Sequence, residues 1–554
     1  MTKLPPGVSA GDFAAAVKLF RAAVGEEWVM TNDDEVNPYR DTFSTVWGTS
    51  DERIPSAAVS PTTVEQVQAI VRAAGRYKIP LFPISTGKNF AYGGPSPNLS
   101  GSVIVDLKRM NKVLEVDEGR HFALVEPGVS YFDLYRYIQD RGLKVWIDCP
   151  DPGWGSPVGN SLDHGIGYTM GYFRDHFGAH CGMEVVLANG EVMRTGMGAL
   201  PNAKSWQDFK YGYGPDPSGL FAQGNYGIVT KMGFRLMPQP EYYRTGLITV
   251  PKRQDFIQLV KTVNYMSDSS LIGEPLYGTP LQSLMANTAF RELIDKPGGP
   301  SDAEMDQAAS DNHLHSWSVE LQFYGPEKTC LANWEYAKDR FAQDIPGAKS
   351  VEGENLKVPL TAEQLHSAGG DFPSLSRRNT TQGVPSLGIW KTIGRSPGFP
   401  GFVNTEGPME GHAGFIPIIP RTGEAVFEAQ RVFGDTMREF DLPRFGSAIG
   451  TPVNWYQFAF QMGFVPSTSR DNPAHNAKVD KALRRMTEVC AEHGWGDYRS
   501  PPVYQDLVAD VYSFNNHVLR RFNEMLKDAV DPNGILAPGR GGVWPQRFRG
   551  MRKA

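Results

Sequence analysis

The chain has 554 residues, of which 40% are hydrophobic and 21% charged, a composition that indicates a soluble globular protein of two or three domains. The net charge is −6, and the Lys and Arg residues are scattered along the chain, so nucleic acid is not an expected partner. The four cysteines lie far apart and form no C-x-x-C pair, which argues against a disulfide framework and against a metal site.

The first 25 residues read as a short amphipathic helix, because they contain no apolar run that could serve as a secretory signal. No other segment approaches the roughly 18 apolar residues that a membrane-spanning helix needs. We therefore expect a cytoplasmic protein without membrane contact, with its cysteines as buried thiols.

From residue 56 onward, predicted helices and strands alternate. Helical spacing covers residues 63–79 and 131–142, and the second of these helices is stopped by Gly142. Strands are predicted over residues 81–85, 102–107 and 122–129. Residues 181–196 then form a hairpin, since Asn189-Gly190 is a strong turn signal.

A proline-containing stretch near residue 243 marks a predicted domain boundary. It is followed by amphipathic helices over 327–343, 424–440 and 475–493, and residues 366–411 are the least structured stretch. We expect residues 1–242 to form one domain, to which residues 494–554 return. Residues 243–493 form the second domain.

The last sixty residues are predicted to form one helix over 503–530, followed by an extended segment over 531–540. Four prolines and glycines give that segment a tight conformation that a free tail would not need: Pro532, Gly534, Pro538 and Gly539. The segment is therefore expected to pack back on the molecule.

Residues 83–94, PISTGKNFAYGG, begin as a strand and end in a glycine-containing turn. Such a turn can point successive backbone N–H groups at an anion, most plausibly a phosphate. Tyr92 places an ionisable hydroxyl in the same turn. No G-x-G-x-x-G follows a strand, and Gly87-Lys88 lacks the other residues of a P-loop, so the common nucleotide-binding motifs are disfavoured.

Six blocks in this order resemble the vanillyl-alcohol oxidase and 4-cresol dehydrogenase family of FAD enzymes: residues 83–94, 126–129, 157–169, 181–201, 224–234 and 531–540. The resemblance covers nearly the whole chain. It implies an α+β protein with the two-domain FAD-binding fold of the vanillyl-alcohol oxidase type, whose cap domain is an antiparallel sheet with helices. For any single glycine in these blocks, an ordinary turn remains the alternative.

The resemblance also implies which residues hold FAD. The pyrophosphate would bind backbone N–H groups of the loop Thr86, Gly87, Lys88 and Asn89. Further cofactor-contacting loops match Gly159 with Asn160, and Gly227, Ile228 and Val229 up to Thr230. No metal is implied.

Two further residues match positions near the flavin ring. His412 matches the histidine that carries the flavin covalently in some relatives, and Trp390 stands where other relatives have a linking tyrosine. Arg540 matches a cation near flavin N1 and the C2 carbonyl, where it would stabilise the reduced ring. A polar loop histidine and a backbone-anchoring arginine are the alternatives.

Phenol recognition in the family matches Tyr92, Tyr498 and Arg499. Binding a phenol of pKa about 10 as phenolate at neutral pH requires a shift of about three units, or roughly 4 kcal/mol. One arginine and two phenolic donors, at roughly 1.5–3 kcal/mol per charge-assisted bond, could supply it. The alternative is a surface Tyr-Arg pair and a packed turn aromatic.

The implied reaction is transfer of a hydride from the side-chain carbon at the para position of the phenolate to flavin N5, leaving a quinone methide. Addition of water, loss of the alcohol proton or loss of a side-chain proton then gives an alcohol, an aldehyde or an alkene. Asp175 matches the family's aspartate near N5, which acts as base or balances charge. The segment before it is about two residues longer than the family pattern, and Arg174 could pair with it instead.

The cap segment that carries a Met-His-His pattern in relatives has Trp455, Tyr456 and Gln457 here. We expect a para side chain that differs from that of vanillyl alcohol, larger or flatter.

The leading prediction is an oxidase that passes electrons to O2, favoured because no secretory signal is seen. Alternatives are a dehydrogenase that uses a cytochrome c or other acceptor, and a flavin-fold binding module without turnover. A homo-oligomer, a dimer or larger, is expected.

Overall fold

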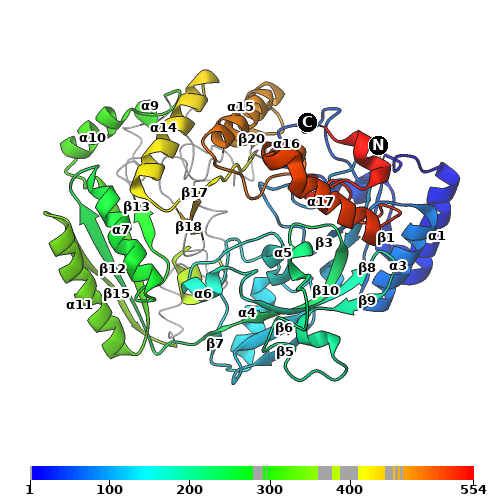
Figure 1. The fold of residues 1–554 in the computed structure, drawn as a ribbon, viewed down its shortest axis with the longest axis horizontal. Helices are drawn as coiled ribbons and strands as arrows, with labels where there is room; N and C mark the ends of the chain where they lie inside the picture. The colour runs from blue at the N-terminus through cyan, green and yellow to red at the C-terminus, as the bar shows by residue number, and fades with distance from the viewer. Residues whose placement is uncertain are drawn as a thin grey trace.

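The structure is a computed structural model, and the elements carry the labels of Figure 1. It describes residues 3–278, 291–294, 296–359, 377–386, 410–442, 453–455, 459–461 and 466–553.

The N-terminal part begins with a four-stranded sheet in the order β1-β2-β4-β3, in which β2, β4 and β3 are parallel and β1 is antiparallel. Its strands are β1 (Val29–Met30), β2 (Ala57–Val59), β3 (Leu81–Ile84) and β4 (Val103–Asp106). Helices α1 (Ala10–Val24) and α3 (Val64–Tyr77) bury apolar side chains at helical spacing in the core beside this sheet. The helix and strands predicted here are confirmed.

A second, antiparallel sheet follows in the order β5-β6-β10-β8-β9. Its strands are β5 (Val113–Asp117), β6 (Phe122–Val125), β8 (His180–Leu187), β9 (Val192–Arg194) and β10 (Gly227–Arg235). The predicted hairpin is the β8–β9 turn, where Gly190 has φ +82°. Helix α4 (Tyr131–Asp140) contributes its buried side chains to the same core as this sheet.

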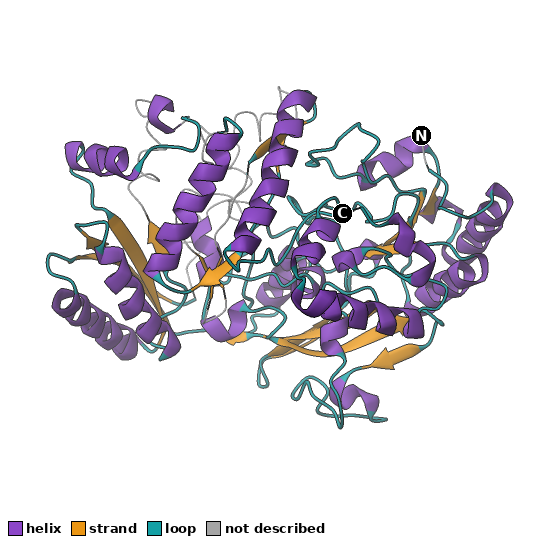
Figure 2. Cartoon of the chain, turned by 45° about the horizontal axis from the view of Figure 1, so that its top comes forward, coloured by secondary structure: helices purple, strands orange, loops and turns teal. Residues whose placement is uncertain are grey.

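The cap is an antiparallel sheet with helices, as predicted. Its strands run in the order β13-β14-β12-β15 and are β12 (Tyr242–Val250), β13 (Leu276–Gly278), β14 (Trp317–Gly325) and β15 (Lys349–Lys357). Its helices include α7 (Asp255–Asp268), α11 (Glu327–Asp344), α14 (Gly423–Glu439) and α15 (Pro473–Glu492). Figures 1 and 2 show this sheet on the opposite side of the molecule from the N-terminal helices.

Aromatic side chains fill the core of the cap. Phe256 of α7 stacks on Trp317 of β14 with ring centroids 3.8 Å apart, and Trp334 of α11 is fully buried. A Cβ at Gly246 would lie 2.3 Å from the Trp334 ring. Glycine at this position in β12 therefore lets α11 pack closely on the sheet.

The remaining elements are short, apart from α10. The helices are α2 (Asp33–Val36), α5 (Pro157–Leu162), α6 (Gly171–Arg174), α9 (Arg291–Ile294) and α10 (Asp302–Asp311). The strands are β7 (Val145–Trp146), β11 (Met237–Pro238), β16 (Glu410–His412), β17 (Ile418–Pro420), β18 (Val453–Trp455), β19 (Ala459–Gln461) and β20 (Ser467–Ser469). Within the predicted irregular stretch 366–411, residues 377–382 form a 3-10 helix, and residues 366–376 and 387–409 lie outside the described residues.

The C-terminal helix predicted over 503–530 is in fact two helices, α16 (Gln505–Val511) and α17 (Phe514–Val530). The prediction of one continuous helix was wrong: Tyr512 and Ser513 separate α16 from α17, and in the first turn of α17 Asn515, Asn516 and His517 have φ between +47° and +55°. Asparagine tolerates this left-handed conformation better than most residues, so the two asparagines allow the chain to turn here.

The extended segment after α17 packs back on the molecule, as predicted. Leu81 of β3 donates its N–H to the Ile535 carbonyl at 2.6 Å and accepts from the Ala537 N–H at 2.8 Å. The buried Lys527 ammonium lies 2.8 Å from Asp531 and donates to the Leu536 carbonyl at 2.6 Å. The tail thus extends the edge of the first sheet and is held by a buried ion pair.

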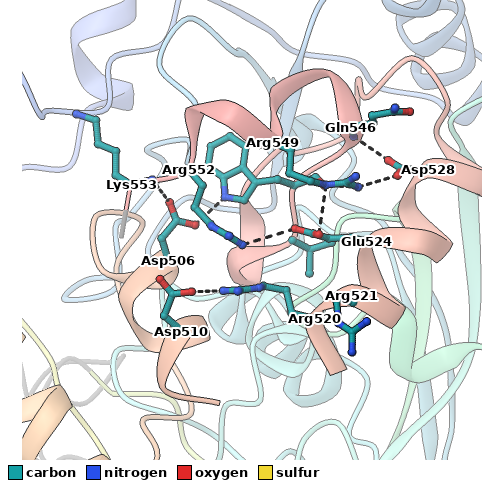
Figure 3. Close-up of polar contacts among 12 residues, drawn as sticks. Asp506, Asp510, Arg520, Arg521, Glu524, Asp528, Gln546, Arg549, Arg552 and Lys553 are labelled. Carbon is teal, nitrogen blue, oxygen red and sulfur yellow. Dashed lines mark hydrogen bonds and ion pairs between the residues drawn. The ribbon is translucent and has the colours of Figure 1, made fainter. Parts of the chain in front are cut away.

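An ion-pair network fixes the last residues of the chain (Figure 3). Arg549 lies between Glu524, at 3.2 Å, and Asp528, at 2.6 Å, on α17. Asp506 accepts the Trp544 indole N–H at 2.7 Å and the Lys553 backbone N–H at 3.0 Å. These contacts hold the last described residues against α16 and α17.

A buried ion pair joins the cap to the N-terminal part of the molecule. Arg174 of α6 contacts Glu274, and the Glu274 N–H donates to the Thr169 carbonyl at 3.0 Å. Both charged side chains are almost fully buried.

In the described part of the chain, no helix combines the length and apolar character needed to cross a bilayer.

Candidate functional site

The loop after β3 has a backbone shaped by residues in the left-handed region. Gly87 has φ +67° and Gly93 has φ +102°, and a Cβ at Gly93 would lie 2.2 Å from the ring of Pro502. The Thr86 hydroxyl is buried and has no hydrogen-bond partner among the described residues. A buried polar group without a protein partner fits a loop that holds a polar ligand such as a phosphate.

Gly159 and Asn160 lie on α5, against this loop. A Cβ at Gly159 would lie 2.1 Å from the Ser85 hydroxyl, so only glycine lets the helix approach so closely. The Asn160 side-chain oxygen contacts the His176 ring and lies 3.5 Å from the Tyr131 hydroxyl. α5 and the loop therefore form one surface.

Gly227, Ile228 and Val229 were expected in a loop, and this expectation was wrong: they begin strand β10. The Ile228 and Val229 side chains are buried in separate hydrophobic cores. β10 pairs with β6 only from Met232 onward, so on that edge the backbone of residues 227–229 makes none of the described strand pairings. These residues could meet a cofactor through backbone groups only.

Asp163, to which the sequence reasoning gave no role, joins three predicted site residues. One carboxylate oxygen accepts from the Asn89 amide at 2.7 Å and pairs with Arg499 Nε at 2.9 Å, and the other oxygen contacts Arg540. The Arg499 guanidinium also contacts the Asn89 side-chain oxygen. The loop, the Tyr498-Arg499 segment and the C-terminal tail thus meet at one carboxylate.

Tyr92 and Arg499, 407 positions apart in the chain, are stacked. The guanidinium carbon of Arg499 lies 3.9 Å from the centroid of the Tyr92 ring, a cation–π contact. Burial raises the pKa of Tyr92 to about 12, although Arg499 acts to lower it. Burial also raises the pKa of Tyr498, so both hydroxyls are protonated donors at neutral pH.

Arg499 remains fully charged in this setting. Burial alone would lower its pKa, but Asp163, Tyr498 and Tyr92 together outweigh burial and raise it. The predicted set of two tyrosines and one arginine is therefore brought together with the cation intact.

Asp497 is a second acidic residue that the sequence reasoning did not single out. It is 3% exposed and accepts backbone N–H groups of Ile416 at 3.2 Å and Arg499 at 3.3 Å. Burial raises its pKa to about 7, against the opposing effect of these backbone hydrogen bonds and the Arg499 charge. Its place directly before Tyr498 in GWGDYRSPP was the available signal.

A cavity of ≈ 440 Å³ opens beside these groups, large enough for part of a cofactor or a small aromatic ligand. The charged residues that line it are Asp163, Asp497, Arg499, Arg520 and Arg540, with His164 and Tyr498 next to them. Apolar residues of α16 and α17, Val508, Ala509 and Leu519, form another wall.

His412 ends β16 and pairs with Ser467 of β20. Its ring lies 5.2 Å from that of Phe43, and two residues later the Gly414 N–H donates to the Ala91 carbonyl at 3.3 Å. A Cβ at Gly414 would be 3.2 Å from the Tyr92 ring. The His412 segment therefore runs beside the Tyr92 loop. Burial lowers the His412 pKa to about 4, so its imidazole is neutral at neutral pH.

Asp175 follows α6 and accepts the Gly178 N–H at 2.8 Å. The ion-pair partner found for Arg174 is Glu274 of the cap, so the pairing with Asp175 considered from the sequence is not the one formed. Burial lowers the pKa of His164, while the charges of Asp163 and Asp175 act in the opposite direction, so Asp175 lies within electrostatic range of a residue that lines the cavity.

Some predicted residues cannot be placed in this site. Trp390, Tyr456 and Gln457 lie outside the described residues, and only the backbone of Trp455, at the end of β18, is described. No three His, Cys, Asp or Glu side chains within the described ranges come together as a metal site would require.

Comparison with known proteins places this geometry in context. A family model described as FAD binding domain matches residues 55–196. The 4-cresol dehydrogenase (hydroxylating) flavoprotein subunit of Pseudomonas putida is 34% identical over 543 residues, covering 98% of this chain and 97% of its own. The 1'-carboxy-chondrochloren decarboxylase of Chondromyces crocatus is 37% identical over 232 residues, 41% of each chain.

Two solved structures are similar over nearly their whole length. The 4-ethylphenol oxidase of Gulosibacter chungangensis, in complex with isoeugenol, has a TM-score of 0.84 at 34% identity and covers 99% of this chain and 100% of its own. A substrate-bound p-cresol methylhydroxylase has a TM-score of 0.83 at 33% identity, covering 98% and 99%.

Proposed function

Because the chain belongs to the vanillyl-alcohol oxidase and 4-cresol dehydrogenase family of FAD-dependent oxidoreductases, we propose that it oxidises para-substituted phenols, either 4-alkylphenols or 4-hydroxybenzylic alcohols. The observation that carries the proposal is the meeting of Tyr92, Tyr498 and Arg499 beside a cavity. In this proposal the FAD-binding part comprises residues 1–242 and 494–554, and the cap comprises residues 243–493.

The residues at the site fit FAD. The loop from Thr86 to Asn89, with its unpartnered buried hydroxyl, would hold the pyrophosphate, and α5 and the start of β10 would meet other parts of the cofactor through close backbone approach. Arg540 would lie by the flavin ring. When bound, FAD supplies the two-electron acceptor for oxidation of the substrate's para side-chain carbon.

The protein groups bind the phenol as its anion. Tyr92 and Tyr498 keep their protons at neutral pH, so each can donate a hydrogen bond to the phenolate oxygen, while Arg499 supplies positive charge. The negative charge on the phenolate oxygen weakens the C–H bond of the para side chain. Asp175 would act as base or balance the positive charge that develops there.

The finer parts of the proposal concern acceptor, attachment and assembly. We propose O2 as acceptor, which gives hydrogen peroxide, with a cytochrome c or other acceptor as the second candidate, because relatives of both kinds are similar over the whole chain. His412 would carry the flavin covalently; its neutral imidazole supports this, because the attacking nitrogen must be unprotonated. A homo-oligomer located in the cytoplasm completes the proposal.

A substrate screen tests this proposal. The purified yellow protein is mixed with 4-alkylphenols and 4-hydroxybenzylic alcohols in air, and hydrogen peroxide and dye reduction are measured side by side. We expect oxidation with stoichiometric peroxide, and vanillyl alcohol is not expected to be the best substrate because of Trp455 and Tyr456. Dye reduction without peroxide would favour the cytochrome-linked alternative, and a colourless protein that takes up no FAD would refute the assignment.

A further inference from the structure

A phenol that binds as its anion has to release a proton, and the site contains a group suited to receive it. Asp497 immediately precedes Tyr498 and Arg499, lines the same cavity, and has only 3% of its surface exposed. Its Oδ1 is held by the Ile416 and Arg499 backbone N–H groups, whereas its Oδ2 has no hydrogen-bond partner in the described part of the chain. A buried carboxylate oxygen without a donor is costly, and a proton on it removes that cost.

The charges of the site lead to the same group. Arg499 and Arg540 share the single carboxylate of Asp163, and Arg520 is paired with Asp510, which leaves one positive charge. If Asp497 is ionised, that charge is already balanced, and a phenolate would make the buried cluster negative. If Asp497 carries a proton, the phenolate balances the cluster. Burial of an unbalanced charge is unfavourable, so phenolate binding and protonation of Asp497 favour each other.

We propose that Asp497 takes up the proton of the substrate hydroxyl, so that the phenol enters neutral and is held as phenolate beside a protonated Asp497. The phenol O–H bond breaks, an O–H bond forms on Asp497 Oδ2, and no proton leaves the protein. This inference rests on the proposed function, since it presupposes a phenol bound by Tyr92, Tyr498 and Arg499.

The groups that act on Asp497 come from several elements. Burial raises its pKa to about 7, while the backbone N–H groups of Ile416, Tyr498 and Arg499 and the Arg499 charge act to lower it. The charge of Asp497 raises the pKa of four neighbouring groups: Tyr92 of the loop, Tyr498, Cys490 of α15 and Tyr512 next to α16. Burial is the larger cause of the raised pKa in each of them. These four groups are neutral at neutral pH, so none of them competes with Asp497 for the phenol proton.

Counting the protons released on binding tests the inference. The FAD-loaded protein is titrated calorimetrically with 4-bromophenol, which has no carbon side chain at the para position to oxidise, in buffers of different ionisation enthalpy. Wild-type protein should release about one proton per phenol near pH 6, where Asp497 is already protonated, and close to none near pH 8. Asp497→Asn should release about one proton at both pH values. Asp435→Asn, an exposed carboxylate on α14, is the matched control and should behave as wild type.

The outcomes separate this inference from the proposed function. Equal proton release by wild type and Asp497→Asn near pH 8, with phenol bound in both, would overturn the role of Asp497 alone. Should Asp497→Asn fail to fold, wild-type release that stays constant between about pH 6 and about pH 8 would overturn it too. Absence of 4-bromophenol binding to wild type would overturn both the inference and the proposed function.

Discussion

Replacing Arg499 by glutamine should raise the pKa of a bound phenol, because it destabilises the bound phenolate more than the bound neutral phenol. A charge-assisted hydrogen bond contributes roughly 1.5–3 kcal/mol, which corresponds to about one to two pKa units of the bound phenol. The structure places the effect at the upper end of this range. Arg499 lies 2.9 Å from Asp163. When Arg499 is removed, Arg540 alone neutralises the Asp163 charge, so the phenolate loses its cation and is exposed more directly to the negative charge of Asp163.

The assay uses 4-nitrophenol, whose phenolate is yellow and whose neutral form is colourless. Difference spectra of the ligand-saturated protein against pH give the pKa of the bound phenol directly. We expect it to be about one to two units higher in Arg499→Gln than in wild type. Arg499→Lys, which keeps the charge but loses the planar fork, should fall between them.

Arg136→Gln is the matched control, because Arg136 is an exposed arginine of α4 outside the cavity lining. A bound-phenol pKa that is equal in wild type and Arg499→Gln would refute the reasoning that Arg499 stabilises the phenolate.

Three other changes test separate parts of the structure. His412→Ala should release the flavin into the supernatant on acid precipitation, whereas wild type keeps its colour; free flavin from wild type would show that no covalent bond exists. Lys527→Met removes a fully buried ammonium that lies 2.8 Å from Asp531, a loss of about 3–5 kcal/mol, and should speed amide hydrogen exchange at Ile535 and Leu536; unchanged exchange would contradict this role. Asp497 is held at a pKa of about 7 in the folded state against 3.8 ordinarily, so the folded protein binds more protons than the unfolded chain between these values, and its stability falls as pH rises through that window by on the order of 4 kcal/mol. The unfolding temperature of Asp497→Asn should therefore rise relative to wild type from about pH 4 to about pH 7, and parallel profiles would argue against the raised pKa.

Local patterns in the sequence predicted most of the secondary structure. The 3.6-residue spacing of α3 and α4, the Asn189-Gly190 turn and the proline and glycine residues after Val530 each reflect local physical preferences. The break between α16 and α17 was missed because helical spacing continues across it. Asn515-Asn516, in the first turn of α17 just after that break, was the local signal that the helix is not continuous, since asparagine is the residue most tolerant of the left-handed region after glycine.

The residues missed in the site were those whose role depends on contacts between distant segments. Asp163 reads as an ordinary helix-end aspartate until the fold brings Asn89, Arg499 and Arg540 to it. Asp497 stands directly before Tyr498, but its burial has no local signal, because it accepts the backbone N–H of Ile416 from a distant segment. Sequence blocks could identify Tyr92 and Tyr498 by resemblance, but only the structure brings out the charge balance around them.

The most direct test of the account is anaerobic reduction of the bound flavin by a phenol and by its methyl ether. 4-Ethylphenol and 4-ethylanisole carry the same ethyl side chain at the para position, but only the phenol can be held as an anion by Tyr92, Tyr498 and Arg499. In a stopped-flow experiment, 4-ethylphenol should bleach the yellow protein and 4-ethylanisole should not. Equal bleaching by both compounds, or bleaching by neither, would contradict oxidation through a bound phenolate.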